Sequence, residues 1–385
     1  MSNRPTWSPS HAALLLGAAI LAATAPAQAE PAQGKEELAV ARLQVRSADG
    51  ARFLALGGFF QARVGIGGAH ASSAELSLHR TRLYLFGNPG LKDVRLRLMI
   101  GSEGSNVIGV FDAYAEWTRH ESFHLRAGRT KLPVFRDWVE AAPLLAGAGR
   151  AAPTLAMLPG RAPGVVASGA LFREGIEYSA GVFHGAGDVG PFREGRGIAG
   201  TARIVWNVFH RPIDGEVDIE GVPTALVVGG SALAAAALRG TCGASTGGIE
   251  NPRVEADLSS VCTDGLGGPG SRTLAGVEVL LRRKHWDVGG EILAGVERLA
   301  ATTTRVGGYL RTDHYVPALQ GSGGLRVSRL LERGEIHRAE TSFEVDAAYY
   351  IRGHELKVTS DLGVTRRDGD SLLSPLVRLQ IQALF

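Results

Sequence analysis

The chain has 385 residues, a formal net charge of +3 and a mean hydropathy of +0.05. So small a net charge produces no field that would attract a nucleic acid, and we expect no such partner. After residue 29 the sequence contains no run of about 18 uncharged apolar residues, which excludes a bundle of membrane-spanning helices.

The N-terminus has the pattern of an export signal. Arg4 precedes an apolar run over residues 12–23, which ends at Ala27-Gln28-Ala29 before Glu30. The run is too short to span a bilayer as a helix, and its small-residue end fits a cleavage site. We therefore predict a signal peptide over residues 1–29, which leaves 356 residues (385 − 29) in the exported chain.

Most of the remaining sequence alternates between apolar and polar residues. Over residues 91–101, Val94, Leu96, Leu98 and Ile100 share one face, and charged residues share the other. This period of two is typical of β-strands. Applied along the chain, it predicts sixteen strands, at 52–66, 76–87, 91–101, 107–118, 122–129, 164–171, 174–183, 199–209, 222–238, 272–283, 285–299, 305–315, 324–331, 338–352, 354–365 and 375–385.

A soluble β-sandwich and a transmembrane β-barrel both produce such alternation. Strands of about 10 residues fit a tilted membrane crossing, and aromatic residues occur near the strand ends. The long connections, 130–163 and 239–271, fall at one end, whereas turns at 88–90, 119–121 and 353 alternate with them, with longer exceptions at 210–221 and 316–323. These features favour an all-β, antiparallel transmembrane barrel over residues 52–385, preceded by a short periplasmic segment over residues 30–51.

The last strand alternates up to Phe385, which resembles the assembly signal of outer-membrane barrels. Several further segments resemble the phosphate-selective porin O/P family, namely 57–61 (GGFFQ), 80–82 (RTR), 112–114 (DAY), 128–133 (GRTKLP), 182–185 (VFHG), 307–309 (GGY) and 349–357 (YYIRGHELK). The resemblance spans most of the exported chain. It implies a homotrimer of sixteen-stranded channels that are inserted by the barrel assembly machinery and surrounded by outer-membrane lipids.

The resemblance also implies anion binding by wall arginines and lysine clusters, but this chain departs from that pattern. Lysine occurs only at positions 35, 92, 131, 284 and 357, so nearly all of the 41 basic residues are arginine, which pairs well with phosphate and carboxylate groups. The candidate pore-lining residues are Arg80, Arg82, Arg95, Arg97, Arg126, Lys131, Arg136 and Arg203, with Asp112 and Glu116 as acids. They could equally serve only to pair with lumen acids and hold the wall together.

The connection 130–163 is expected to fold inward as the third extracellular loop and to narrow the lumen, with a solvated surface loop as the alternative. The only cysteines, Cys242 and Cys262, lie in a Gly-rich stretch of an exported chain, so we expect a disulfide that protects a loop. The sequence indicates neither a metal site nor a cofactor.

The function expected from these features is passive diffusion of small hydrophilic solutes through an outer-membrane pore, with a weak preference for anions, of which phosphate is one candidate. An outer-membrane hydrolase is the first alternative, for which His120 and Ser122 are the nearest candidates, but no acid partner or elbow motif accompanies them. An adhesin or structural anchor is the second, and it would need larger surface loops.

Overall fold

The computed structural model describes residues 43–50, 52–67, 74–91, 93–103, 108–185, 196–239, 270–298, 301–334, 337–370 and 373–385. The predicted signal peptide, residues 1–29, and both cysteines lie outside these residues. The strands are β1 (Leu43–Arg46), β2 (Phe53–Gly67), β3 (Ala74–Asn88), β4 (Val94–Glu103), β5 (Gly109–His120), β6 (Phe123–Lys131), β7 (Arg161–Leu171), β8 (Ile176–His184), β9 (Arg196–Asn207), β10 (Ala225–Arg239), β11 (Gly270–Arg283), β12 (Trp286–Arg298), β13 (Thr302–Val316), β14 (Gly321–Arg333), β15 (Arg338–Arg352), β16 (Leu356–Arg367) and β17 (Ser374–Leu384).

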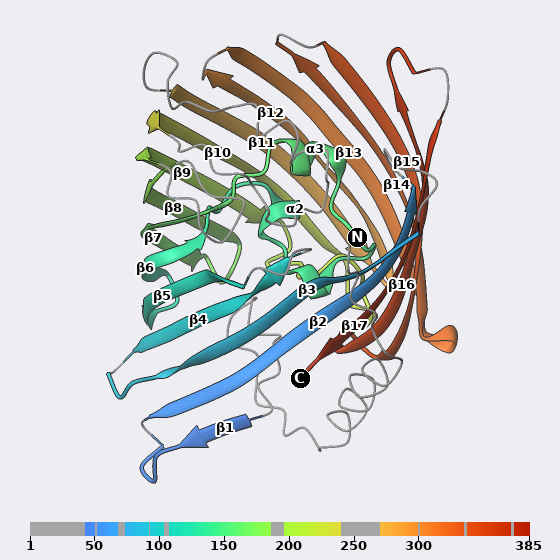
Figure 1. Cartoon of the computed structure of the whole chain (residues 1–385). Coiled ribbons are helices and arrows are strands. Elements are labelled where there is room, and N and C mark those ends of the chain that lie inside the picture. The colour runs from blue at the N-terminus through green and yellow to red at the C-terminus, as the bar shows by residue number, and fades with distance from the viewer. Residues whose placement is uncertain are drawn as a thin grey trace, which may run out of the picture.

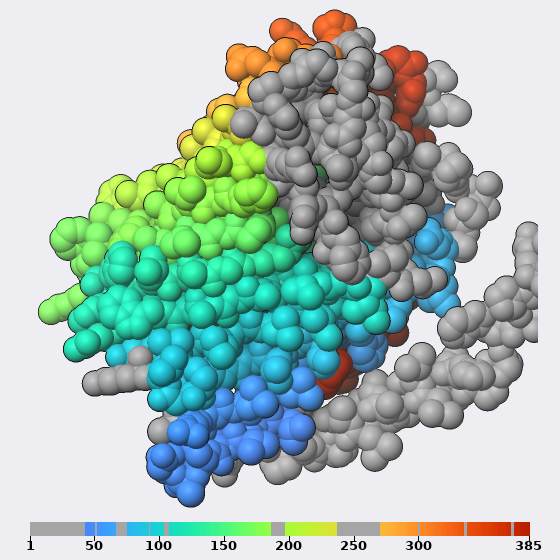
Figure 2. All heavy atoms as spheres, turned by 60° about the vertical axis from the view of Figure 1, so that its left-hand side comes forward, coloured from blue at the N-terminus to red at the C-terminus, as the bar shows by residue number. Residues whose placement is uncertain are grey.

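Strands β2 to β17 form one closed barrel (Figure 1). Each pairs antiparallel with the next strand in the chain, and β17 pairs with β2 through Leu384↔Phe59 and its neighbours, which closes the ring. Phe385 extends this seam through two backbone hydrogen bonds with Gly58, of 2.7 and 2.9 Å. Figure 2 shows β2 to β9 following one another from blue to green as a continuous wall.

Most apolar side chains of the strands face outward, and most charged side chains face inward. Ile292 and Leu310 are 65 % and 62 % exposed on the outer face, whereas Glu291 and Arg311, each adjacent in sequence to one of them, are 3 % and 6 % exposed. A soluble sandwich would bury the apolar face in a core. The observed orientation is instead that of a barrel whose outer surface meets lipid. None of the described helices is long and apolar enough to cross a membrane.

The sixteen predicted strands are confirmed as β2 to β17, with ends within about three residues of the predicted ones. The short strand β1 was not predicted. It lies in the N-terminal segment and pairs with the start of β2, through Arg46↔Phe53.

Three predicted connections are shorter than expected. The prediction of a connection over 316–323 was wrong because β13 continues to Val316. Only the 3-10 helix η2 (Pro317–Leu319) and Gln320 separate it from β14. The predicted range of the turn at 119–121 was wrong because β5 continues to His120, which pairs with Phe123 across a two-residue turn. The loop 130–163 shortens to 132–160 because β6 and β7 remain paired up to Lys131↔Arg161.

Two connections enter the barrel from opposite ends. The inner loop, residues 132–160, carries the short helices α2 (Arg136–Val139), η1 (Ala142–Leu144) and α3 (Ala152–Ala156), and α2 and α3 lie inside the ring of strands in Figure 1. The inner turn, residues 208–224, joins β9 to β10 at the same end as Phe385 and buries Ile213, Glu216 and Val217. The predicted inward fold of the third loop is therefore confirmed, and the inward fold of the inner turn was not predicted.

Candidate functional site in the barrel lumen

The inner loop is held to the wall of β10 to β14 by apolar packing. Phe135, Trp138 and Met157 pack with inward Leu274 and Leu293 in one buried cluster. Small residues on the wall make room for the loop. A Cβ at Gly276 would lie 2.8 Å from the ring of Phe135, and one at Gly307 would lie 2.9 Å from Pro153. Larger residues at these two glycines would push the loop away from the wall.

Wall side chains also satisfy the backbone of the inner loop on this side. Glu291 accepts hydrogen bonds from the N–H groups of Arg136 and Asp137, at 2.5 and 2.9 Å, and Ser231 accepts one from Phe135. Tyr309 donates its hydroxyl to Glu291 at 2.9 Å. An irregular backbone inside a barrel needs such partners because unsatisfied buried amides cost about 1–3 kcal/mol each.

From this wall the inner loop crosses the lumen to β14–β17. There Lys357 donates to the carbonyl of Leu145 at 2.6 Å, and Arg326 donates to that of Gly149 at 2.8 Å. Asp361 accepts a hydrogen bond from the Ala148 N–H at 3.0 Å. The inner loop thus contacts both sides of the barrel, a geometry that narrows the space for a solute.

Charged side chains of the barrel wall bind the backbone of the inner turn. Arg282 donates to the carbonyls of Asp214 and Gly215, at 2.9 and 3.2 Å, and Asp287 accepts the Asp218 N–H at 2.8 Å. The turn is therefore anchored to β11 and β12.

Glu216 joins the inner turn to the inner loop. Its carboxylate accepts the Ala146 N–H at 2.7 Å and forms an ion pair with Arg311 at 2.7 Å, while its own N–H donates to the carbonyl of Leu144. Burial would raise the pKa of Glu216, but Arg311 and the Ala146 N–H outweigh burial and lower it. The carboxylate is therefore charged at neutral pH, and the two inward segments meet at a buried ionic contact.

Charged side chains in the rest of the lumen mostly alternate in sign. On β14 to β17, Arg326 and Arg378 share Glu344 at 2.9 and 2.6 Å, and Arg378 also pairs with Asp361 at 2.8 Å. On β9 and β11, Arg203 pairs with Glu278 at 2.5 Å. Arginine and carboxylate are balanced on this side of the barrel.

The wall from β2 to β7 differs because its arginines outnumber its carboxylates. Arg80 and Arg82 share one acid, Glu103, at 2.8 and 2.6 Å, and Arg82 also stacks 3.6 Å from the ring centroid of Phe111. Arg126 pairs with Glu116 at 2.9 Å. The arginines on this face are Arg63, Arg80, Arg82, Arg95, Arg97, Arg126 and Arg161, and the acids are Glu75, Glu103, Asp112 and Glu116.

The structure brings some of the predicted site residues together and separates others. Arg80 and Arg82 lie side by side on β3, and Arg126 faces Glu116. Lys131 and Arg136 mainly bind the inner loop and inner turn: Lys131 donates to the carbonyls of Trp138, Val139 and Glu140. Arg136 pairs with Glu140 and donates to the carbonyls of Ile213 and Gly215.

Several lumen residues were missed, notably Arg63, Glu103, Arg161, Lys357 and Asp361. The inward position of Arg63, Lys357 and Asp361 follows the same alternation as that of the predicted residues, so the strand pattern alone could have found them. Glu103 and Arg161 lie beyond the ends of the predicted strands, and Arg161 does not follow the inward alternation of β7. Asp112 pairs with Arg161 at 3.0 Å, which links β5 to the start of β7.

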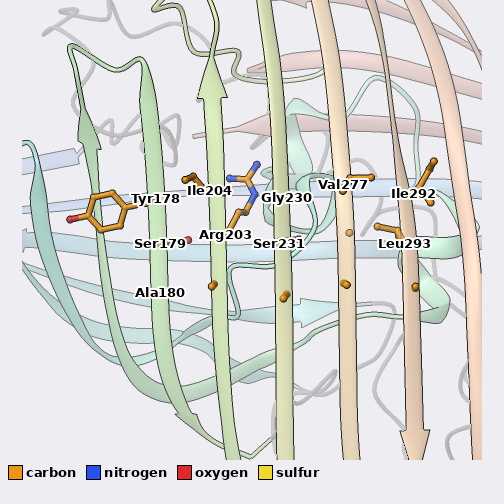
Figure 3. Close-up of a pocket in the computed structure, with 15 residues that line it drawn as sticks. Tyr178, Ser179, Ala180, Arg203, Ile204, Gly230, Ser231, Val277, Ile292 and Leu293 are labelled. Carbon is orange, nitrogen blue, oxygen red and sulfur yellow. The ribbon is translucent and has the colours of Figure 1, made fainter.

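The outer wall over β8–β12 carries a shallow hollow of about 700 Å³ (Figure 3). Outward Ala180, Ala202, Gly230, Ala232 and Ala275 are small and lower the surface between larger side chains. The hollow lies on the apolar face, so it belongs to the lipid-facing surface and not to the lumen.

No family model matches the sequence, and no curated protein matches it either. Solved structures match it by fold. An anion-selective porin from Comamonas acidovorans superimposes with a TM-score of 0.58 at 10 % identity, covering 87 % of this chain and all of that chain. The channel DcaP of Acinetobacter baumannii gives a TM-score of 0.53 at 13 % identity, with 89 % and 99 % covered. A loop-deletion mutant of OmpT, an outer membrane protein of Vibrio cholerae, gives 0.60 at 8 % identity, with 87 % and 100 % covered. The chain therefore has the fold of outer-membrane porins and channels.

Proposed function

We propose that this protein is an outer-membrane porin through which small hydrophilic solutes diffuse passively, with a weak preference for anions. One observation carries the proposal: a closed barrel with an apolar exterior surrounds a charged interior that two inward segments narrow. Such a pore needs neither a cofactor nor an energy source, because the narrow region and the wall charges set what passes.

The anion preference is supported by the excess of arginine on the wall of β2 to β7. Fixed charges on a low-dielectric wall raise the local concentration of counter-ions even when the whole protein is nearly neutral. Elsewhere in the described lumen, arginine and carboxylate are balanced, so the preference should be small. Phosphate could be one such anion, but the binding groups would be arginines and not a lysine cluster.

The experiment is a reversal-potential measurement in planar bilayers under a salt gradient. The test variant is Arg126→Gln, since the Arg126 side chain is 24 % exposed, compared with 2 % for Arg80. The matched control is Arg283→Gln, which removes an exposed, outward-facing arginine at the end of β11 nearest the inner turn. We expect the wild type to prefer anions, and Arg126→Gln to shift the reversal potential toward cations at about 0.1 M salt but less at about 1 M, where the Debye length is about 3 Å. A cation-selective wild type, or equal potentials in both variants, would contradict the proposal.

We further propose membership of the phosphate-selective porin O/P family, export by the signal peptide, a homotrimer, and assembly through Phe385 and the barrel assembly machinery. The motif order in the sequence supports the family, and the seam between Phe385 and Gly58 supports the assembly role. The disulfide between Cys242 and Cys262 is a proposal as well, which thiol labelling of the folded protein would test. Native mass spectrometry in mild detergent would test the trimer.

An enzyme is not favoured. No hydrogen bond joins His120 to Ser122 among the described residues, and the His120 ring packs against Trp117 instead. The carbonyl of Ser122 accepts a hydrogen bond from Tyr178. These contacts are those of a periplasmic turn and not of a hydrolase site. An adhesin or structural anchor remains the other alternative, and absence of any conductance would favour it.

A further inference from the structure

A row of polar side chains crosses the outer face of β14, β15 and β16. Arg329 pairs in register with Thr341, and Thr341 pairs with Arg366. Both arginines are exposed, and Thr341 is half-buried between them. The next outward row toward the middle of the barrel is apolar and consists of Val327, Phe343 and Val364, which are 44 %, 44 % and 37 % exposed.

The two arginines have no acidic partner among the residues that the structure describes. The nearby Arg338 and Arg367 point inward and share Glu340 at 3.3 and 3.0 Å. Neither Arg329 nor Arg366 forms an ion pair or hydrogen bond with a described residue, although acidic side chains follow Arg366 in the turn after β16. The two positive charges therefore face the outside of the barrel, and no described acidic side chain pairs with them.

The geometry suits a single anion held between them. Strands in a sheet lie about 4.8 Å apart, so the Cα atoms of Arg329 and Arg366 are about 10 Å apart, which two arginine side chains can bridge through a shared group. Arginine binds phosphate oxygens with paired N–H donors, and the Thr341 hydroxyl between them can donate as well.

The depth of the row fits the headgroup region. Arg329 lies four residues from the end of β14 at Arg333, which places it about 10 Å below the strand end for a strand tilted by about 40°. An arginine facing lipid is costly at the bilayer midplane but costs little near the interface. At that level the groups that meet the wall are lipid headgroups.

We propose that Arg329, Thr341 and Arg366 bind the phosphate of an anionic lipid at the end of the barrel opposite Phe385, with an acyl chain over Val327, Phe343 and Val364. The proposal rests on the membrane location in the proposed function and is independent of the solute that the lumen passes. A porin without anion preference would leave it intact.

The test measures lipid retention by the purified barrel in detergent, by native mass spectrometry. The probes are lipid A with both phosphates, the same lipid with its phosphates removed, and inorganic phosphate. The double variant Arg329→Gln/Arg366→Gln is compared with Arg283→Gln, which removes an exposed arginine at the other end of the outer wall. Heat-modifiable migration shows that each variant is folded.

We expect the double variant to bind phosphorylated lipid A about tenfold or more weakly than the wild type, since both cationic contacts to the anionic headgroup are lost. Arg283→Gln should bind as the wild type does, and dephosphorylated lipid A should bind all forms weakly. Equal retention by the double variant, or equal retention of the dephosphorylated lipid, would overturn the proposal. Complete displacement of lipid A by millimolar inorganic phosphate would also overturn it, because the site would then recognise free phosphate.

Discussion

Replacing Glu216 by glutamine should loosen the contact between the inner turn and the inner loop. The wild-type carboxylate accepts the Ala146 N–H and pairs with Arg311, both at 2.7 Å, and Glu216 is 5 % exposed. Glutamine keeps the size and one acceptor oxygen but loses the charge. Arg311 would then retain Asp313, at 3.4 Å, as its nearest ion-pair partner.

The expected loss of docking free energy follows from the two interactions of Glu216 that lose their charge, the hydrogen bond from Ala146 and the ion pair with Arg311. Hydrogen bonds to charged groups contribute about 1.5–3 kcal/mol, and part of this remains in the neutral amide. We estimate a loss of about 2 kcal/mol in the docking of the two segments, which corresponds to a factor of about 30 in the equilibrium between docked and undocked states. The apolar contact of Val217 with Tyr315 and Tyr350 remains, so the barrel itself should stay folded.

Single-channel recording in planar bilayers measures the result. We expect Glu216→Gln to raise the mean conductance and the open-channel noise. The matched control is Glu220→Gln, an exposed acid in the same turn, which makes the same change of net charge. Equal conductance and noise in the two variants would refute the reasoning, because the contact would then not limit the current.

Three further predictions concern assembly, the loop anchor and pH. Phe385 forms two backbone hydrogen bonds with Gly58, and deleting it should lower the outer-membrane level of heat-modifiable barrel far more than Gln380→Ala does. Equal levels of the two variants in blots of membrane fractions would count against an assembly role. Lys357→Met should release the carbonyl of Leu145 and increase the cleavage of the inner loop by an added protease, whereas unchanged cleavage would show that the apolar packing suffices. The pKa of Glu216 is lowered in the folded state, so its stabilising effect is present above the ordinary glutamate value of about 4.3 and is lost only as pH falls below it. The difference in conductance between the wild type and Glu216→Gln should therefore stay constant from about pH 7 to 5 and shrink below about pH 4. A step in that difference near neutral pH would exclude Glu216 as its origin.

The barrel could be predicted because each strand repeats one local rule. Alternation assigns every residue of a strand to one of two faces, and a shift by one residue would place charges in lipid. The inward position of Arg80, Arg82 and Glu116 follows directly from that rule. Strand β1 has only four residues, too few for its alternation to stand out from a connecting segment.

The interior could not be predicted in the same way because its contacts join segments far apart in the sequence. Residues 216–220 (EVDIE) alternate charged and apolar residues and are typical of a solvated turn. Glu216 and Asp218 of this stretch are buried against Arg311 and Asp287, which lie on strands that follow much later in the chain. Arg282, on another later strand, binds the preceding carbonyls of the same turn. No local pattern indicates that a periplasmic turn will meet these groups inside the barrel.

The same contacts change the interpretation of the basic residues. From the sequence, Lys131 and Arg136 are the natural candidates for attracting anions, since they flank the start of the inner loop. In the structure their donors bind backbone carbonyls of the inner loop and inner turn, so much of their hydrogen-bonding capacity is already used. A cation that holds a loop still contributes to the field in the pore, but its removal also moves the loop. Selectivity is therefore better tested at Arg126, which pairs with a neighbouring strand and anchors neither inward segment among its described contacts.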